Sequence, residues 1–185
     1  MFMKKLFYFL MVLMTVSFLT SSCDKDDEPE VKKAKLGAQN NTVAGGFYSV
    51  SENKVYTMDD AAQNQSVIDL LCFYEEGNDI AIASPGTGIS DIFTGENAPE
   101  NWTTQNTTYF TKTTLTVSQF DALVETDELI VTSFDTANAY RKAKNLVMDD
   151  IYAFKTAAEA YGLFKVTEVV QGAEGSVAFE VKVKK

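Results

Sequence analysis

The acidic side chains that could do chemistry in this chain include two adjacent pairs. Asp59 and Asp60 form one pair, and Asp149 and Asp150 form the other. A glycosidase needs two carboxyl groups held across a sugar-binding cleft, but adjacent side chains project in different directions, so neither pair makes such a dyad alone. The sequence contains no D-x-[DN]-x-[DN]-G calcium loop. We therefore predict that these aspartates lie at solvated turns or helix starts.

Two patterns of hydroxyl and glycine residues also suggest chemistry. Ser51 and Lys54 have the S-x-x-K spacing of serine acyl enzymes, where the lysine amine takes the hydroxyl proton. The residues around Asn53 favour a tight turn instead, and the partner motifs S-D-N and K-T-G are absent. Residues 84–88 (SPGTG) are glycine-rich but lack the lysine of a phosphate-binding loop. Both patterns are interpreted as turns.

The sequence contains no histidine. This excludes Ser-His-Asp and Cys-His catalysis, histidine zinc sites and proton shuttling by histidine. Cys72 lies in an apolar run, and we predict that it is a buried thiol without a disulfide partner. We therefore expect a protein that is not an enzyme, with no cofactor and no metal site.

The region from 85 to 114 is the least regular part of the chain, and a loop of this length is often functional. It holds the only tryptophan, Trp102, followed by Tyr109 and Phe110. Aromatic faces beside amides and hydroxyls suit stacking on sugar rings, so Trp102 and Tyr109 in the 97–110 loop are candidate ligand contacts for a glycan. The other interpretation is that Trp102 fixes the loop onto the core.

The N-terminus has the pattern of an export signal. Residues 1–5 (MFMKK) are basic, and residues 6–20 are uncharged but too short to span a bilayer comfortably. Residues 20–23 (TSSC) resemble a bacterial lipobox, although Thr20 stands where leucine is usual. The resemblance implies that residues 1–22 are a signal peptide and that Cys23 is lipidated. Several acyl chains on one cysteine give stable membrane anchoring.

An acidic run follows Cys23 directly. Lys25, Asp26, Asp27 and Glu28 resemble the lipoprotein export signal of the Bacteroidota. The resemblance implies a surface-exposed lipoprotein of uncharacterised type, anchored in the outer membrane. Such a run is also a solvated segment that cannot bury itself.

Length and charge bound the remaining chain. Removal of residues 1–22 leaves 185 − 22 = 163 residues, which is enough for one domain. We assign residues 23–42 to an acidic and polar tether and 43–185 to a single globular domain. The formal net charge of −10 argues against nucleic acid as a partner, because that partner requires a basic surface.

Period-two and β-branched patterns predict strands through most of the domain, and the last strand, 177–184, is expected to have one buried and one solvated face. A capping box at 118–121 predicts a short helix, and apolar residues at helical spacing predict a second over 135–148. We expect an α+β domain with a mainly antiparallel sheet, two short helices and a C-terminal β-meander. The other predicted strands cover 43–50, 54–57, 66–75, 80–83, 151–156 and 162–170.

Two weaker resemblances complete the sequence evidence. Residues 135–137 (DTA) resemble the short O-glycosylation motif of Bacteroidota envelope proteins, which makes Thr136 a candidate acceptor. The segment from Phe154 to Val166 is similar to uncharacterised Bacteroidota lipoproteins. We expect a non-enzymatic, lipid-anchored envelope protein that acts as a surface interaction or accessory module with a protein or glycan partner. The alternatives are a glycan-binding lipoprotein using the 97–110 loop and a glycosidase that relies on carboxylates alone.

Overall fold

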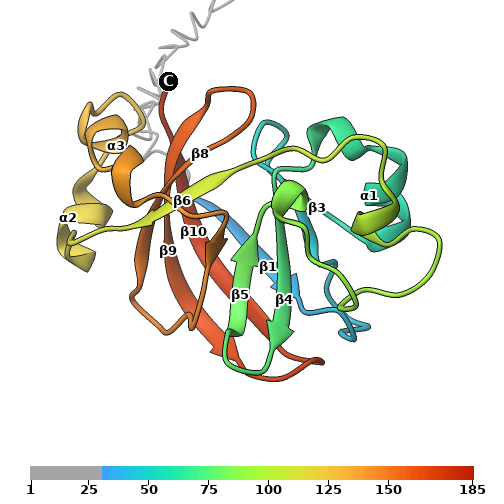
Figure 1. Ribbon diagram of the computed structural model, residues 1–185. Coiled ribbons are helices and arrows are strands. Elements are labelled where there is room, and N and C mark those ends of the chain that lie inside the picture. The colour runs from blue at the N-terminus through green and yellow to red at the C-terminus, as the bar shows by residue number, and fades with distance from the viewer. Residues whose placement is uncertain (1–30) are drawn as a thin grey trace, which may run out of the picture.

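The computed structural model describes residues 31–185, in which ten strands form two antiparallel sheets (Figure 1). The first sheet has the strand order β1-β10-β9-β8-β6, and the second has the order β3-β2-β4-β5-β7. The predicted α+β class with a C-terminal β-meander is confirmed. The bounds are β1 Lys32–Gly37, β2 Phe47–Ser49, β3 Lys54–Tyr56, β4 Leu70–Glu75, β5 Asp79–Ala83, β6 Tyr109–Lys112, β7 Lys142–Ala143, β8 Ile151–Lys155, β9 Tyr161–Val170 and β10 Ser176–Val183.

Three short α-helices and four 3₁₀ turns connect the strands of the described residues. The capping box of α2 joins Thr116 to Gln119, so this helix begins before the predicted box at 118–121. The reciprocal bonds satisfy backbone N–H groups at the helix start. The bounds are α1 Met58–Gln63, α2 Val117–Ala122, α3 Leu129–Thr132, η1 Gln65–Val67, η2 Pro85–Thr87, η3 Pro99–Asn101 and η4 Thr136–Asn138.

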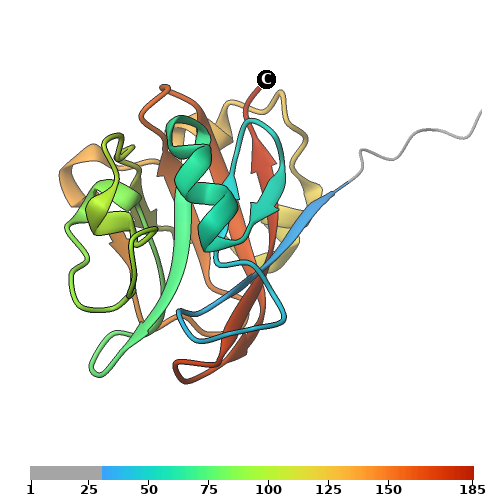
Figure 2. The ribbon, with the colours of Figure 1, turned by 90° about the vertical axis from the view of Figure 1, so that its right-hand side faces the viewer.

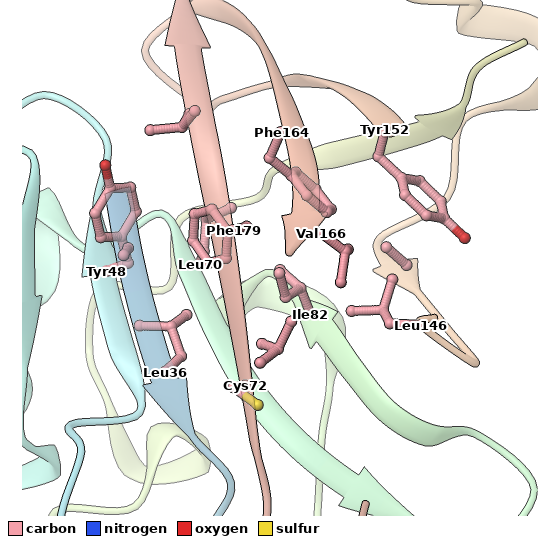
Figure 3. Packing of buried hydrophobic residues seen from close by; sticks show 14 of the residues in the cluster. Leu36, Tyr48, Leu70, Cys72, Ile82, Leu146, Tyr152, Phe164, Val166 and Phe179 are labelled. Carbon is pink, nitrogen blue, oxygen red and sulfur yellow. The ribbon is translucent and has the colours of Figure 1, made fainter. Parts of the chain in front are cut away.

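The main core lies between the two sheets (Figure 3). Tyr48 from β2 meets Phe179 from β10 edge to face, with ring centroids 5.7 Å apart. Phe164 from β9 contacts Phe179 at 5.5 Å and stacks on Tyr152 at 5.4 Å. Cys72 is a fully buried free thiol in this cluster, as predicted. Because the inner faces of both sheets contribute side chains, neither sheet can bury its apolar face without the other.

Each sheet also buries part of its outer face, so the domain has four layers (Figures 1 and 2). α1 and the segment around Trp102 cover the second sheet. α2 and α3 cover the first sheet through Phe120 and Ile130. The prediction of a solvated outer face on β10 is therefore wrong at Lys182, which is 7 % exposed beneath α2.

The predicted tether is also wrong in its C-terminal half. Residues Lys32–Gly37 form β1, which pairs with β10 in the first sheet. Leu36 is fully buried in the main core, whereas Lys33 and Lys35 face solvent. The alternation of two small apolar side chains with lysines is too brief to stand out in the sequence. The domain therefore includes residues from β1 onward and does not begin at Val43.

The helix predicted over 135–148 does not form. Its central residues, Lys142 and Ala143, form β7 and pair with β5. Asn145 and Asp149 have φ angles of 53° and 69°, which end any right-handed helix. The hydrogen-bonding edge of β5 thus overrides a helical spacing that rested on only four apolar residues.

The two sheets are joined along both edges. Phe110 of β6 and Tyr140 exchange reciprocal backbone hydrogen bonds of 2.7 and 2.9 Å just before β7 begins. On the other side, the Gly37 N–H donates to the Gly45 carbonyl at 3.0 Å. A Cβ on Gly37 would lie 2.6 Å from the Ala44 oxygen, so glycine is required for this close approach.

Lys182 offers a test of the outer helical layer. Its Nζ donates to the carbonyl oxygens of Phe120, Asp121 and Leu123 at 2.7, 2.9 and 2.6 Å. Lys182→Met keeps most of the side-chain volume but removes the donor from the Asp121 and Leu123 carbonyls, whereas the Phe120 carbonyl still accepts from the Leu123 N–H. We expect a loss of about 2–4 kcal/mol in the free energy of unfolding, measured by urea denaturation.

The matched control is Lys35→Met in the same sheet. Lys35 is half exposed and forms a surface ion pair with Glu168, so its loss should change stability by less than about 0.5 kcal/mol. Equal effects of the two substitutions would show that the Lys182 contacts contribute nothing specific.

Candidate functional site

A pocket of about 390 Å³ opens between the two sheets and is lined in part by the C-terminal residues. Figure 1 marks the end of the molecule at which the C-terminus lies. The pocket forms where β2, β8 and β10 end and where β1, β4 and β9 begin. Its volume lies within the range of small-molecule sites. The residues lining this inter-sheet pocket are Lys32, Val50, Ser51, Ser66, Val67, Asp69, Asn106, Thr156, Ala157, Ala158, Ala160, Val183, Lys184 and Lys185.

Asp69 is the one acidic residue in the lining of the inter-sheet pocket. It is 6 % exposed and stands between Ile68 and Leu70, which are both fully buried. Its N–H donates to the Tyr48 carbonyl at 3.0 Å, and its Oδ2 accepts from the Val50 N–H at 2.9 Å. The carboxylate is therefore fixed against the end of β2.

The charge of Asp69 has no protein counter-ion among the described residues. Burial raises the pKa of Asp69 to about 6, and the Val50 N–H opposes the shift only in part. Burial, followed by the charge of Asp69, also raises the pKa of Tyr48. In the part of the chain that the structure describes, no side chain donates a hydrogen bond to Oδ1 of Asp69.

The lysines that line the pocket are engaged elsewhere. Lys32 and Lys185 both pair with Glu125, at 2.8 and 2.5 Å. Lys184 pairs with Glu128 at 2.9 Å and donates to the Thr126 carbonyl. These lysines contribute their aliphatic stems to the pocket wall while acidic residues of the α2–α3 region hold their ammonium groups.

Asn106 fixes another wall of the inter-sheet pocket. Its Nδ2 donates to the carbonyls of Ser66 and Ile68, each at 2.9 Å, which ties the loop before β6 to the segment before β4. The Asn106 carbonyl in turn accepts from the Ser84 hydroxyl at 2.5 Å. Loops far apart in the sequence therefore form one polar wall beside Asp69.

Trp102 does not provide the stacking surface that a glycan site in the 97–110 loop would use. It is 6 % exposed, packs on Phe47 with ring centroids 5.4 Å apart, and donates from Nε1 to the Asn97 carbonyl. Tyr109 is 40 % exposed at the start of β6, in the other sheet. Trp102 therefore anchors its loop to the outer face of the second sheet. The two candidate ligand contacts do not share a core cluster, because Tyr109 is exposed on the first sheet.

The paired aspartates differ from each other in surroundings. Asp59 and Asp60 are exposed in the first turn of α1, as predicted. Asp150, by contrast, is buried and pairs with Lys112 at 2.6 Å, so the prediction of a solvated turn is wrong there. The burial of Asp150 follows from its position directly before β8, where Lys112 of the neighbouring β6 reaches it.

The remaining sequence predictions fall at separate places. Ser51 lies in the turn between β2 and β3, and Thr136 is exposed in η4. Cys23, Lys25, Asp26, Asp27 and Glu28 lie outside the described residues. Within residues 31–185, no cluster of three metal-ligating side chains occurs, and no helix has both the length and the apolar character to cross a membrane.

Sequence reasoning missed Asp69 as a site residue. The signal was present, because Asp69 is the one acid in the apolar run 67–73 of the predicted buried strand 66–75. An acid in such a run must either be paired or occupy a functional site. The sequence does not show which residues surround it.

Comparison with known proteins identifies a fold and no activity. No protein-family model matches the chain, and no curated protein matches it. A crystal structure of a DUF4466 family protein from Parabacteroides merdae is similar, with a TM-score of 0.56 and 19 % sequence identity. The match covers 84 % of this chain and 54 % of that protein, so this chain spans about half of its length. At this identity the similarity shows the fold alone. Its source belongs to the Bacteroidota, the group whose lipoproteins the N-terminal motif resembles.

Because Asp69 is buried, its ionised form should lower the free energy of unfolding, and this cost should depend on pH. Its folded-state pKa of about 6 is above the ordinary value of 3.8, so the folded protein binds the proton more tightly than the unfolded chain does. Stability from this group is present below about pH 4 and is lost as the pH rises through 6. Asp69→Asn keeps an acceptor for Val50 and removes the charge. We expect a gain of about 1–3 kcal/mol at pH 8 that falls below about 1 kcal/mol at pH 4, measured by urea denaturation at both pH values.

Asp149→Asn serves as the matched control. Asp149 is exposed and has a left-handed φ of 69°, which asparagine adopts readily. Its replacement should change stability by less than about 0.5 kcal/mol at either pH. If Asp69→Asn were destabilising at pH 8, the buried carboxylate would be stabilising and the inter-sheet pocket would lose its main feature as a candidate site.

Proposed function

We propose that this chain is a lipid-anchored, non-enzymatic binding protein on the outer face of the outer membrane, with the inter-sheet pocket as its binding site. The observation that carries the proposal is the uncompensated carboxylate of Asp69 at the wall of a 390 Å³ pocket. A buried charge without a partner lowers stability, and groups of this kind concentrate at functional sites.

The composition of the pocket supports binding more than catalysis. A glycosidase that relies on carboxylates alone needs a second carboxyl group, and the lining provides Asp69 alone. The chain has no histidine to act as a general base. The burial of Trp102 removes the main support for a glycan site in the 97–110 loop. A pocket with a mixed apolar and polar lining and one unpaired carboxylate favours the reversible binding of a small molecule with a polar group.

The anchor and the pocket lie close together along the chain. Lys32 lines the inter-sheet pocket and follows Cys23 by nine residues, which span at most about 30 Å. Lipidation at Cys23 would therefore keep the pocket end of the domain near the membrane surface. The lipid anchor makes the outer membrane itself the first partner of the protein.

The anchor is tested by fractionation of cells. Cys23→Ser should move nearly all of the protein out of the membrane fraction, because the acyl chains can no longer be attached. Alanine replacement of Lys25, Asp26, Asp27 and Glu28 should leave the protein in the membrane but protect it from protease added to intact cells.

The control for the export signal replaces the same number of exposed charges elsewhere in the domain. This variant should remain accessible to the protease. Protein that stays in the membrane after Cys23→Ser would refute the anchor, and surface exposure without the acidic run would refute the export signal. The control positions are Glu76, Glu96, Lys144 and Glu174.

The pocket is tested by a thermal melt of the mature lipoprotein in a non-ionic detergent, against sugars, amino acids and amines. A ligand at about 100 times its dissociation constant stabilises the protein by roughly 2.7 kcal/mol, which raises the melting temperature by roughly 5–10 °C. Ala158→Trp, in the turn between β8 and β9, should abolish the shift because its side chain fills the pocket.

Ala137→Trp provides the matched control. Ala137 is exposed in η4 and does not line the pocket, so this variant should keep the full ligand shift. A ligand shift that survives Ala158→Trp would place the binding site elsewhere. A panel without any shift would argue against a small-molecule binding protein.

A further inference from the structure

We infer that the ligand of the inter-sheet pocket carries an ammonium group that binds Oδ1 of Asp69. This inference rests on the proposed function of the pocket and adds the chemical class of its ligand.

The charges around the pocket leave one negative charge without a partner. The pocket lining contains three lysines, and Glu125 and Glu128 hold all three ammonium groups in ion pairs. Asp69 forms no ion pair within the described part of the chain. A desolvated carboxylate gains most from a charged N–H donor, because such hydrogen bonds are roughly twice as strong as neutral ones. A ligand ammonium would supply the missing counter-ion.

The position of Asp69 is fixed before any ligand arrives. Its Oδ2 accepts from the Val50 N–H at 2.9 Å, and its own N–H is bonded to Tyr48. The flanking residues Ile68 and Leu70 are fully buried in two different clusters. Their packing prevents the backbone at Asp69 from rotating. A group held in this way loses little conformational entropy on binding.

The neighbouring wall provides neutral polar groups. Ser66 lines the pocket, and Asn106 donates from Nδ2 to backbone carbonyls, so the Asn106 amide oxygen remains available as an acceptor. Ammonium and hydroxyl groups are donors that match these acceptors. The expected ligand is therefore a small amine whose other groups are hydroxyls or short methylene chains.

The binding of an amine should depend on pH through Asp69. The charged groups that line the same pocket are Lys32 from β1 and Lys184 and Lys185 after β10, and burial followed by the charge of Asp69 raises the pKa of the Tyr48 hydroxyl from β2. Hydrogen bonds from Lys185 and Lys32 lower the pKa of Glu125, so Glu125 stays ionised above pH 5 and keeps both lysines paired. The carboxyl of Asp69, with a pKa of about 6, is mainly protonated at pH 5. Amine affinity should then be about tenfold weaker at pH 5 than at pH 7.5.

The test compares amines with neutral molecules of matched shape, using isothermal titration calorimetry on the mature lipoprotein in detergent. The pairs are putrescine with butane-1,4-diol and glucosamine with glucose. We expect at least one amine to bind at least tenfold more tightly than its neutral match at pH 7.5. Asp69→Asn should remove that preference, and Asp149→Asn should retain it.

The other outcomes separate this inference from the proposed function. Equal binding of an amine and its neutral match, unaffected by Asp69→Asn but lost in Ala158→Trp, would overturn the ammonium inference and keep the pocket as a site. The ammonium inference would also be overturned, and the pocket kept as a site, if no amine bound but a neutral compound of the thermal panel gave a shift that Ala158→Trp abolished. If neither amines nor any panel compound bound, both proposals would be overturned.

Discussion

The packing of aromatic side chains between the two sheets is the interaction on which the rest of the structure depends. Tyr48 lies far along the chain from Phe164 and Phe179, which belong to the neighbouring strands β9 and β10, and the three rings meet in one cluster. This contact brings the ends of β2, β8 and β10 together and so creates the inter-sheet pocket. Without it, Asp69 would be an ordinary solvated carboxylate at the start of a strand.

The chemistry of Asp69 follows from this packing. Side chains of the core exclude water from one side of the carboxylate, and the ion pairs of Glu125 and Glu128 keep the nearby lysines away from it. The result is a charge that the fold holds at a cost in stability and that a ligand can neutralise. Natural proteins accept such local conflicts mainly where function requires them.

The outer layers show how polar groups can be buried without a functional role. Lys182 is nearly as buried as Asp69, but its Nζ donates to three carbonyls at the end of α2. Asp150 is buried beside Lys112. Both groups have protein partners: Lys182 attaches the end of α2 to the first sheet, and Asp150 joins the start of β8 to the neighbouring β6. Asp69 differs because it lines the pocket and its Oδ1 accepts no hydrogen bond from the described residues.

The sequence by itself determined the α+β class, the C-terminal meander and the buried Cys72, because strong period-two alternation and long apolar runs are local signals. It could not reveal β1, whose apolar residues stand among lysines, or β7, whose pairing with β5 outweighed a weak helical spacing. The site was harder to predict, since Asp69 appears in the sequence only as one acid within an apolar run. Tertiary structure alone decided that Asp69 forms no ion pair within residues 31–185, because the lysines and carboxylates around the pocket lie more than 30 residues away from it along the chain.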